Sequence, residues 1–96
     1  MKAYIIADVN VTDPTRYEDY KKLMPDSLVP FGGKFIVRGG ETKTLEGDRK
    51  TGRIVILEFP SKEKANAWWS SSEYAPAKAI RQSVSHAQSI VVEGCL

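Results

Sequence analysis

The sequence contains little of the chemistry that usually marks a cross-link or a metal site. Its 96 residues include one cysteine, Cys95, and one histidine, His86. One cysteine excludes a disulfide within the chain, and these two residues are too few for a structural zinc site. No apolar run approaches the roughly 20 residues of a membrane span, and no phosphate-binding glycine loop occurs. We therefore expect no metal, no cofactor and no membrane partner.

The sequence also lacks a large excess of charge of either sign. Fourteen Lys and Arg residues stand against 12 Asp and Glu residues, which gives a net charge of +2. The basic residues are scattered, and this balance argues against a nucleic-acid partner. At the start of the chain, Lys2 is followed by a short apolar run and then Asp8, which does not resemble a signal peptide. We expect a cytoplasmic protein.

The order of the predicted elements indicates an α+β fold. Apolar, β-branched segments predict strands, and two amphipathic segments predict helices, the second broken at the serines 70–72. The order βαββαβ predicts a ferredoxin-like domain over residues 1–96, with a four-stranded antiparallel sheet and both helices on one face. The predicted strands are Ala3–Val11, Lys34–Gly40, Arg53–Phe59 and His86–Gly94.

Local signals give the ends of these elements. Asp13 and Ser61 are good N-caps for the two helices. Pro25 is expected to interrupt or kink the first helix. The polar, turn-rich segment 42–52 predicts a long hairpin arm. On a helix, neighbouring tryptophans point about 100° apart, so we expect Trp68 in the core and Trp69 at a rim or a dimer edge.

The predicted strands are apolar on both faces, although the helices can cover only one of them. A second sheet from another copy would cover the other face, which predicts a homodimer with its sheets face to face. In the first strand, Ile5 and Val9 lie on one face and Ile6 on the other. In the third strand, Val55 and Leu57 lie on one face and Ile54 and Ile56 on the other.

Several motifs in this order resemble the domain of unknown function 1330 family. They include "AYIIADVNVTDPTRYEDY", "GGKFIVRGG", "RIVILEFPS", "SSEYAPAKAIRQ" and the closing "VVEG", and together they cover nearly the whole chain. The resemblance implies membership of the dimeric α+β barrel superfamily, which includes cofactor-independent monooxygenases and isomerases. It implies no particular reaction, because function belongs to sites rather than folds. The chain departs from the family pattern at Trp69, where a tyrosine is common.

Asp8 and Glu58 are charged residues within strands that otherwise read as buried. We expect the first and third strands of such a sheet to be parallel neighbours, which would bring the two carboxylates together and raise one pKa, so that it could act as a general base. The alternative is that both carboxylates lie at strand ends, paired with Arg38, Arg53 or Arg81.

Four other residues are candidate ligand contacts. Arg38 precedes a glycine pair and could hold a carboxylate or phosphate, or else close a salt bridge at the rim. Tyr20 and Tyr74 could orient a ligand, or else pack in the core. His86 could move a proton, or else be an exposed residue at a junction.

Two functions stay open at this point. The first is a cofactor-independent, monooxygenase- or isomerase-like enzyme acting on a small organic anion. The second is a non-catalytic homodimer that binds a small ligand or is purely structural. A cavity with converging polar groups would favour the first, and a filled helix–sheet space would favour the second.

Overall fold

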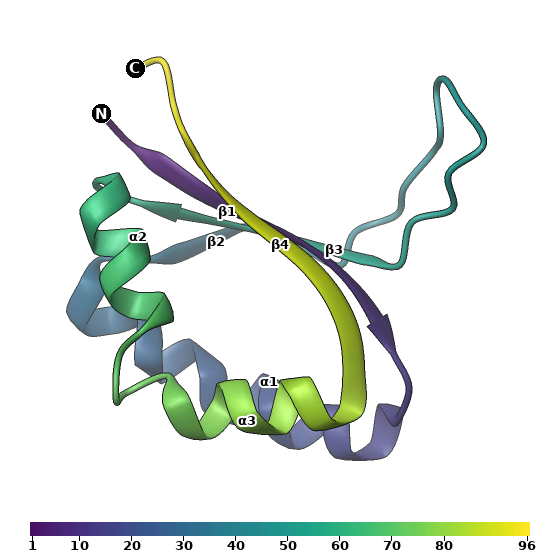
Figure 1. The fold of residues 1–96 in the computed structure, drawn as a ribbon, viewed down its shortest axis with the longest axis horizontal. Helices are drawn as coiled ribbons and strands as arrows, with labels where there is room; N and C mark the ends of the chain where they lie inside the picture. Colours follow the sequence, from purple (N-terminus) through teal and green to yellow (C-terminus); the bar gives the residue numbers. More distant parts are fainter.

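The computed structural model describes all 96 residues, Met1–Leu96, and contains one four-stranded sheet covered by helices on one face (Figure 1). The strand order is β2-β3-β1-β4, and each neighbouring pair is antiparallel. This arrangement confirms the predicted ferredoxin-like fold. The strands are β1 (Ala3–Val11), β2 (Lys34–Arg38), β3 (Arg53–Phe59) and β4 (Ser85–Glu93).

The helices lie together beneath the sheet, and the two ends of the chain lie near each other at one end of it (Figure 1). They are α1 (Pro14–Leu28), a 3-10 turn η1 (Val29–Phe31), α2 (Lys62–Trp69) and α3 (Ala75–Val84). The predicted break in the second helical segment is therefore present. No helix is both long enough and apolar enough to cross a bilayer.

Side-chain caps start the helices where the sequence predicts them. The Asp13 side chain accepts a hydrogen bond from the Arg16 N–H at 3.2 Å, and the Ser61 hydroxyl accepts one from the Lys64 N–H at 3.2 Å. Helix α1 continues through Pro25 to Leu28, so the alternative in which Pro25 interrupts the helix is wrong.

The strand register decides which residues face the helices. Ile5 lies opposite Leu57 and Val91, on the face that the helices cover. Ile6 lies opposite Ile56 and Ile90, on the other face. The core between sheet and helices contains Trp68, which is 2% exposed as predicted, together with Phe59, Tyr74, Met24, Leu28 and Val84.

A bulge in β2 changes which side chains share a face. Phe35 pairs with Leu57, but Val37 pairs with Ile56 and Arg38 pairs with Val55, so the register shifts by one residue between Phe35 and Val37. An extra residue in one strand reverses the alternation beyond it. Arg38 therefore lies on the same face as Phe35, towards the helices.

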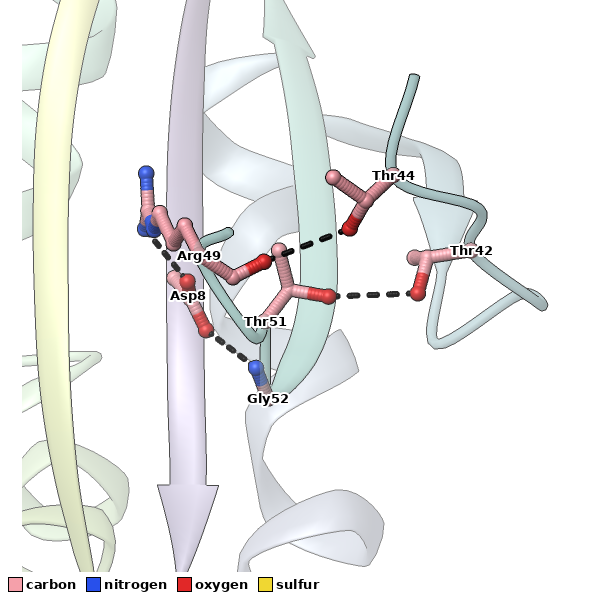
Figure 2. Close-up of polar contacts among 6 residues, drawn as sticks. All are labelled: Asp8, Thr42, Thr44, Arg49, Thr51 and Gly52. Carbon is pink, nitrogen blue, oxygen red and sulfur yellow. Dashed lines mark hydrogen bonds and ion pairs between the residues drawn. The ribbon is translucent and has the colours of Figure 1, made fainter. Parts of the chain in front are cut away.

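The segment 39–52 between β2 and β3 forms an arm that projects away from the helices (Figure 1). Its residues are all exposed and form no strands, so the predicted hairpin arm exists without a regular ladder. Side chains tie its two limbs together (Figure 2): the Thr42 and Thr51 hydroxyls lie 3.1 Å apart, and Thr44 donates to the Arg49 carbonyl at 3.2 Å.

Candidate functional site

A small cavity lies between the inner face of the sheet and the helices. Its volume is about 40 Å³, and 12 of its 17 lining residues are hydrophobic. A cavity that holds benzene measures about 150 Å³, so this one has room for water or the head of a small ligand. The space between helices and sheet is therefore not completely filled.

The charged side chains that line this cavity are all cationic. They are Lys21, Arg38, Arg53 and Arg81, and no Asp or Glu lines it. Lys21 pairs with Glu18 at 3.0 Å, whereas none of the ion pairs in the chain includes the three arginines. The cavity thus carries three guanidinium groups that no carboxylate neutralises.

Arg81 is the most buried of the three. Its residue is 7% exposed, on the face of α3 that also buries Ala77 and Val84. Its Cζ lies 5.9 Å from the centre of the Trp69 ring. Because a buried charge without a counter-ion is costly, the position is one where an anion from outside would be stabilising.

Arg53 enters the cavity from β3, opposite Val9. Its Cζ lies 5.9 Å from the centre of the Tyr17 ring, and its Nε is buried without a hydrogen-bond partner. Gly39 has φ of +70°, and a Cβ there would collide with the Nη1 of Arg53. Glycine at this turn therefore both permits the backbone conformation and leaves room for the guanidinium.

Arg38 lies at the outer part of the cavity. Its guanidinium carbon stands 4.2 Å from the centre of the Phe35 ring, within the range of a cation–π contact. The bulge in β2 makes this contact possible, because without it Arg38 would face the opposite side of the sheet. The rim salt bridge that was the alternative for Arg38 is absent.

Tyr20 and Tyr74 also line the cavity, and their hydroxyl oxygens lie 3.1 Å apart in a buried hydrogen bond. Burial raises the pKa of Tyr20 far above its ordinary value, and the neighbouring Tyr74 raises it further. Burial also raises the pKa of Tyr17, although the charge of Arg53 opposes that shift. The hydroxyls of Tyr17 and Tyr20 therefore stay protonated at neutral pH. Of the Tyr20–Tyr74 pair, the hydroxyl that accepts their mutual hydrogen bond keeps its own proton to donate to a ligand.

The structure does not bring Asp8 and Glu58 together. β1 and β3 are antiparallel, and Asp8 pairs with Ile54 whereas Tyr4 pairs with Glu58, so the carboxylates stand at opposite ends of the strand pair. The parallel arrangement assumed from the sequence is wrong, because β3 follows β2 through a hairpin connection and β2 runs in the direction of β1. Both carboxylates also lie on the face away from the cavity.

Each of these carboxylates has a cationic partner of its own. Asp8 forms an ion pair with Arg49 and accepts a hydrogen bond from the Gly52 N–H at 2.8 Å, which fixes the base of the arm to the sheet (Figure 2). Glu58 lies 3.3 Å from the Lys2 Nζ and 3.4 Å from the Lys34 Nζ. Desolvation raises the pKa of Glu58, but the two lysines outweigh it and hold that pKa below its ordinary value.

His86 does not line the cavity. It is exposed near the start of β4, opposite Asn10 on the outer face, and borders a polar groove together with Asp8 and Arg49. No group of three or more His, Cys, Asp or Glu side chains is placed to hold a metal ion. Of the predicted site residues, the cavity thus collects Arg38, Tyr20 and Tyr74.

Arg53 and Arg81 were missed as site residues, because they were considered as partners for acidic residues. A signal was present for both. Arg81 follows Ala77 by four residues and precedes Val84 by three, so it interrupts an apolar helical stripe. Arg53 alternates with Val55 and Leu57 and therefore shares their inward face.

The model of the domain of unknown function (DUF1330) matches residues 2–95. The chain belongs to the DUF1330 family. No curated protein matches it significantly. The family assignment agrees with the resemblance read from the sequence motifs, and it names no reaction.

Several solved structures share the fold of this DUF1330 protein. A protein of unknown function from Rhodopseudomonas palustris has a TM-score of 0.80 at 18% identity, over 99% of this chain and 83% of its own. SnoaB, a cofactor-independent oxygenase from Streptomyces nogalater, has a TM-score of 0.70 at 11% identity, over 99% and 94%. A dimeric ferredoxin-like protein of unknown function from Jannaschia sp. CCS1 has a TM-score of 0.68 at 12% identity, over 98% and 100%.

Proposed function

We propose that this protein binds a small organic anion in the cavity between its helices and its sheet. The proposal rests on one observation: three arginines without an ion-pair partner, Arg38, Arg53 and Arg81, line the same cavity, and no carboxylate lines it. Arginine binds carboxylates and other oxyanions through charge-assisted hydrogen bonds. The hydroxyls of Tyr20 and Tyr74 would orient the ligand, and the apolar walls would hold its carbon atoms.

We propose further that the protein acts as a homodimer. The sheet face away from the helices carries Ile6, Ile54, Ile56, Ile90 and Val92, and Ile90 is 60% exposed. A second copy placed sheet to sheet would bury these residues. The dimeric Jannaschia protein, which shares the fold, supports this arrangement.

A second candidate is cofactor-independent catalysis on the bound anion, and the likeness to the oxygenase SnoaB favours it. The cavity has no Asp, Glu, His or Cys in its lining. Its residues would therefore act by charge and by hydrogen-bond donation, with the arginines stabilising negative charge as it develops on the substrate.

Thermal unfolding with added anions tests the binding proposal. Propionate, pyruvate and benzoate would be titrated at constant ionic strength, with propionamide and benzamide as uncharged controls. We expect at least one acid to raise the Tm with concentration, since a ligand that binds the folded state stabilises it. The increase should vanish in Arg81→Gln. Equal effects of acids and amides, or of wild type and Arg81→Gln, would contradict the proposal.

The same preparations test catalysis and assembly. Oxygen consumption would be followed with each acid that raises the Tm, and Arg53→Gln should abolish any consumption that depends on the protein. Light scattering would give the mass in solution. A monomeric mass would contradict the proposed homodimer but would not bear on the proposed anion site.

A further inference from the structure

Trp69 stands where the cavity meets the surface. Its side chain lines the cavity and two open grooves beside β4, one of about 210 Å³ and one of about 410 Å³. Ser89 also borders all three spaces. The indole of Trp69 and the strand at Ser89 therefore separate the cavity from the grooves outside.

The two adjacent tryptophans are held very differently. The Trp68 indole N–H donates to the Ser27 hydroxyl at 3.0 Å, and its ring stacks on Tyr74 with the centroids 3.9 Å apart. The Trp69 indole N–H has no hydrogen-bond partner, and its ring meets Trp68 and Tyr74 at 6.4 and 5.9 Å. Trp68 is fixed in the core, whereas the ring of Trp69 is held by weak contacts and is half-buried.

Two cationic side chains lie beside Trp69. Lys78 donates to the Trp69 carbonyl at 2.8 Å, and its Nζ stands 4.8 Å from the centre of the indole ring. Arg81 contacts the same ring at 5.9 Å. The Trp69 ring therefore lies next to Arg81, one of the arginines that would bind the anion. The hydrogen bond from Lys78 keeps the backbone at residue 69 in place if the ring turns.

We propose that Trp69 is the residue that limits the size of the anion this site accepts, and that the ligand enters between Trp69 and β4 to reach Arg81. This proposal rests on the proposed anion-binding function. With the indole in place, the cavity of about 40 Å³ admits only short-chain acids or the head of a larger one. With the indole removed, the cavity and both grooves become one site open to bulky aromatic anions.

The test uses 8-anilinonaphthalene-1-sulfonate, a bulky anion whose fluorescence rises in apolar surroundings, and its uncharged analogue N-phenyl-1-naphthylamine. Titrations would compare wild type, Trp69→Phe, Trp69→Ala and Trp69→Ala with Arg81→Gln. Because a change in pocket size is worth about 10- to 200-fold in discrimination, we expect Trp69→Ala to bind the sulfonate at least about ten-fold more tightly than wild type. Trp69→Phe should stay close to wild type.

Two controls separate a new opening from partial unfolding. Arg81→Gln in the Trp69→Ala background should return the sulfonate affinity towards the wild-type value, and the uncharged analogue should gain less from Trp69→Ala than the sulfonate does. The near-ultraviolet circular dichroism should keep the contribution of Trp68. Equal gains for charged and uncharged probes, or a gain insensitive to Arg81, would overturn the proposal.

Failure of this proposal and failure of the anion site give different results. If short-chain acids stabilise wild type through Arg81 but Trp69→Ala binds the bulky sulfonate no better, the size limit lies elsewhere and the anion site stands. If no acid stabilises wild type and Arg81→Gln changes nothing in any background, the anion site itself is contradicted.

Discussion

The guanidinium of Arg53 occupies the space beside Gly39 in which any other residue would place its Cβ. Gly39 also has φ of +70°, and its N–H donates to the Ile54 carbonyl at 2.8 Å. The sharp turn after β2 and the position of a cavity arginine thus depend on the same missing side chain.

Gly39→Ala should therefore impair both stability and binding. We expect the free energy of unfolding to fall by about 1–2 kcal/mol, the cost of a left-handed conformation for a residue with a Cβ. The rise in Tm with added anion should also shrink, because Arg53 is displaced. Gly40→Ala is the matched control, since nothing lies within 4 Å of a Cβ there. Equal effects at both positions would disprove this role of Gly39.

Arg81→Met should separate binding from folding. Methionine keeps an unbranched apolar chain but removes a buried charge that has no counter-ion. We expect the free energy of unfolding without ligand to stay the same or rise by about 1 kcal/mol, while stabilisation by anions is lost. Chemical denaturation with and without propionate measures both quantities. A loss of several kcal/mol without ligand would assign Arg81 to the folded core instead.

Asp8→Ala should release the arm and leave the cavity unchanged. The variant loses the ion pair with Arg49 and the hydrogen bond from the Gly52 N–H. We expect amide exchange at Gly52 to accelerate about ten-fold, which corresponds to a hydrogen bond of about 1.4 kcal/mol. Asp48→Ala, an exposed change within the arm, is the control. If Asp8→Ala abolished anion binding, the separation of Asp8 from the site would be wrong.

Glu58 should contribute stability that disappears in acid. Its pKa is lowered in the folded state, so its contribution is complete above the pKa of the unfolded chain, about 4.3, and is lost as the pH falls through the folded value. Glu58→Gln should thus be less stable than wild type at neutral pH, and the two should converge as the pH falls below about 4. Glu46→Gln, exposed on the arm, should show no such convergence when unfolding is measured across this range.

The helix starts and the order of the elements along the chain were predictable because they depend on local signals. Asp13 and Ser61 bond to the turns that directly follow them. The position of Arg38 depends on a bulge between Phe35 and Val37, which nothing in the short segment "KFIVR" indicates. The ion pairs of Asp8 and Glu58 depend on strand register and on an irregular arm. The sequence therefore suggested that each carboxylate could pair with a cationic side chain, but it did not indicate which one.

The cavity itself was only partly predictable. Arg38, Tyr20 and Tyr74 were candidates for chemical or conformational reasons, and all three line it. Arg53 lies on the inward face of a strand, and Arg81 lies on the buried face of a helix. From the sequence alone, an arginine at such a position can be either the ion-pair partner of an acidic residue or a contact for a ligand. Only the positions of the acidic side chains in three dimensions decide between these two roles.

The most direct test of the anion site is a nuclear magnetic resonance titration of the ¹⁵N-labelled protein with propionate, with propionamide as the control. Arginine Nε–H and tryptophan indole signals report on the cavity side chains themselves. We predict saturable shifts of the Arg53, Arg81 and Trp69 signals with the acid, none with the amide, and none at Arg49 on the arm. No saturable shift at Arg53 and Arg81, or the same shifts with the amide, would contradict the account.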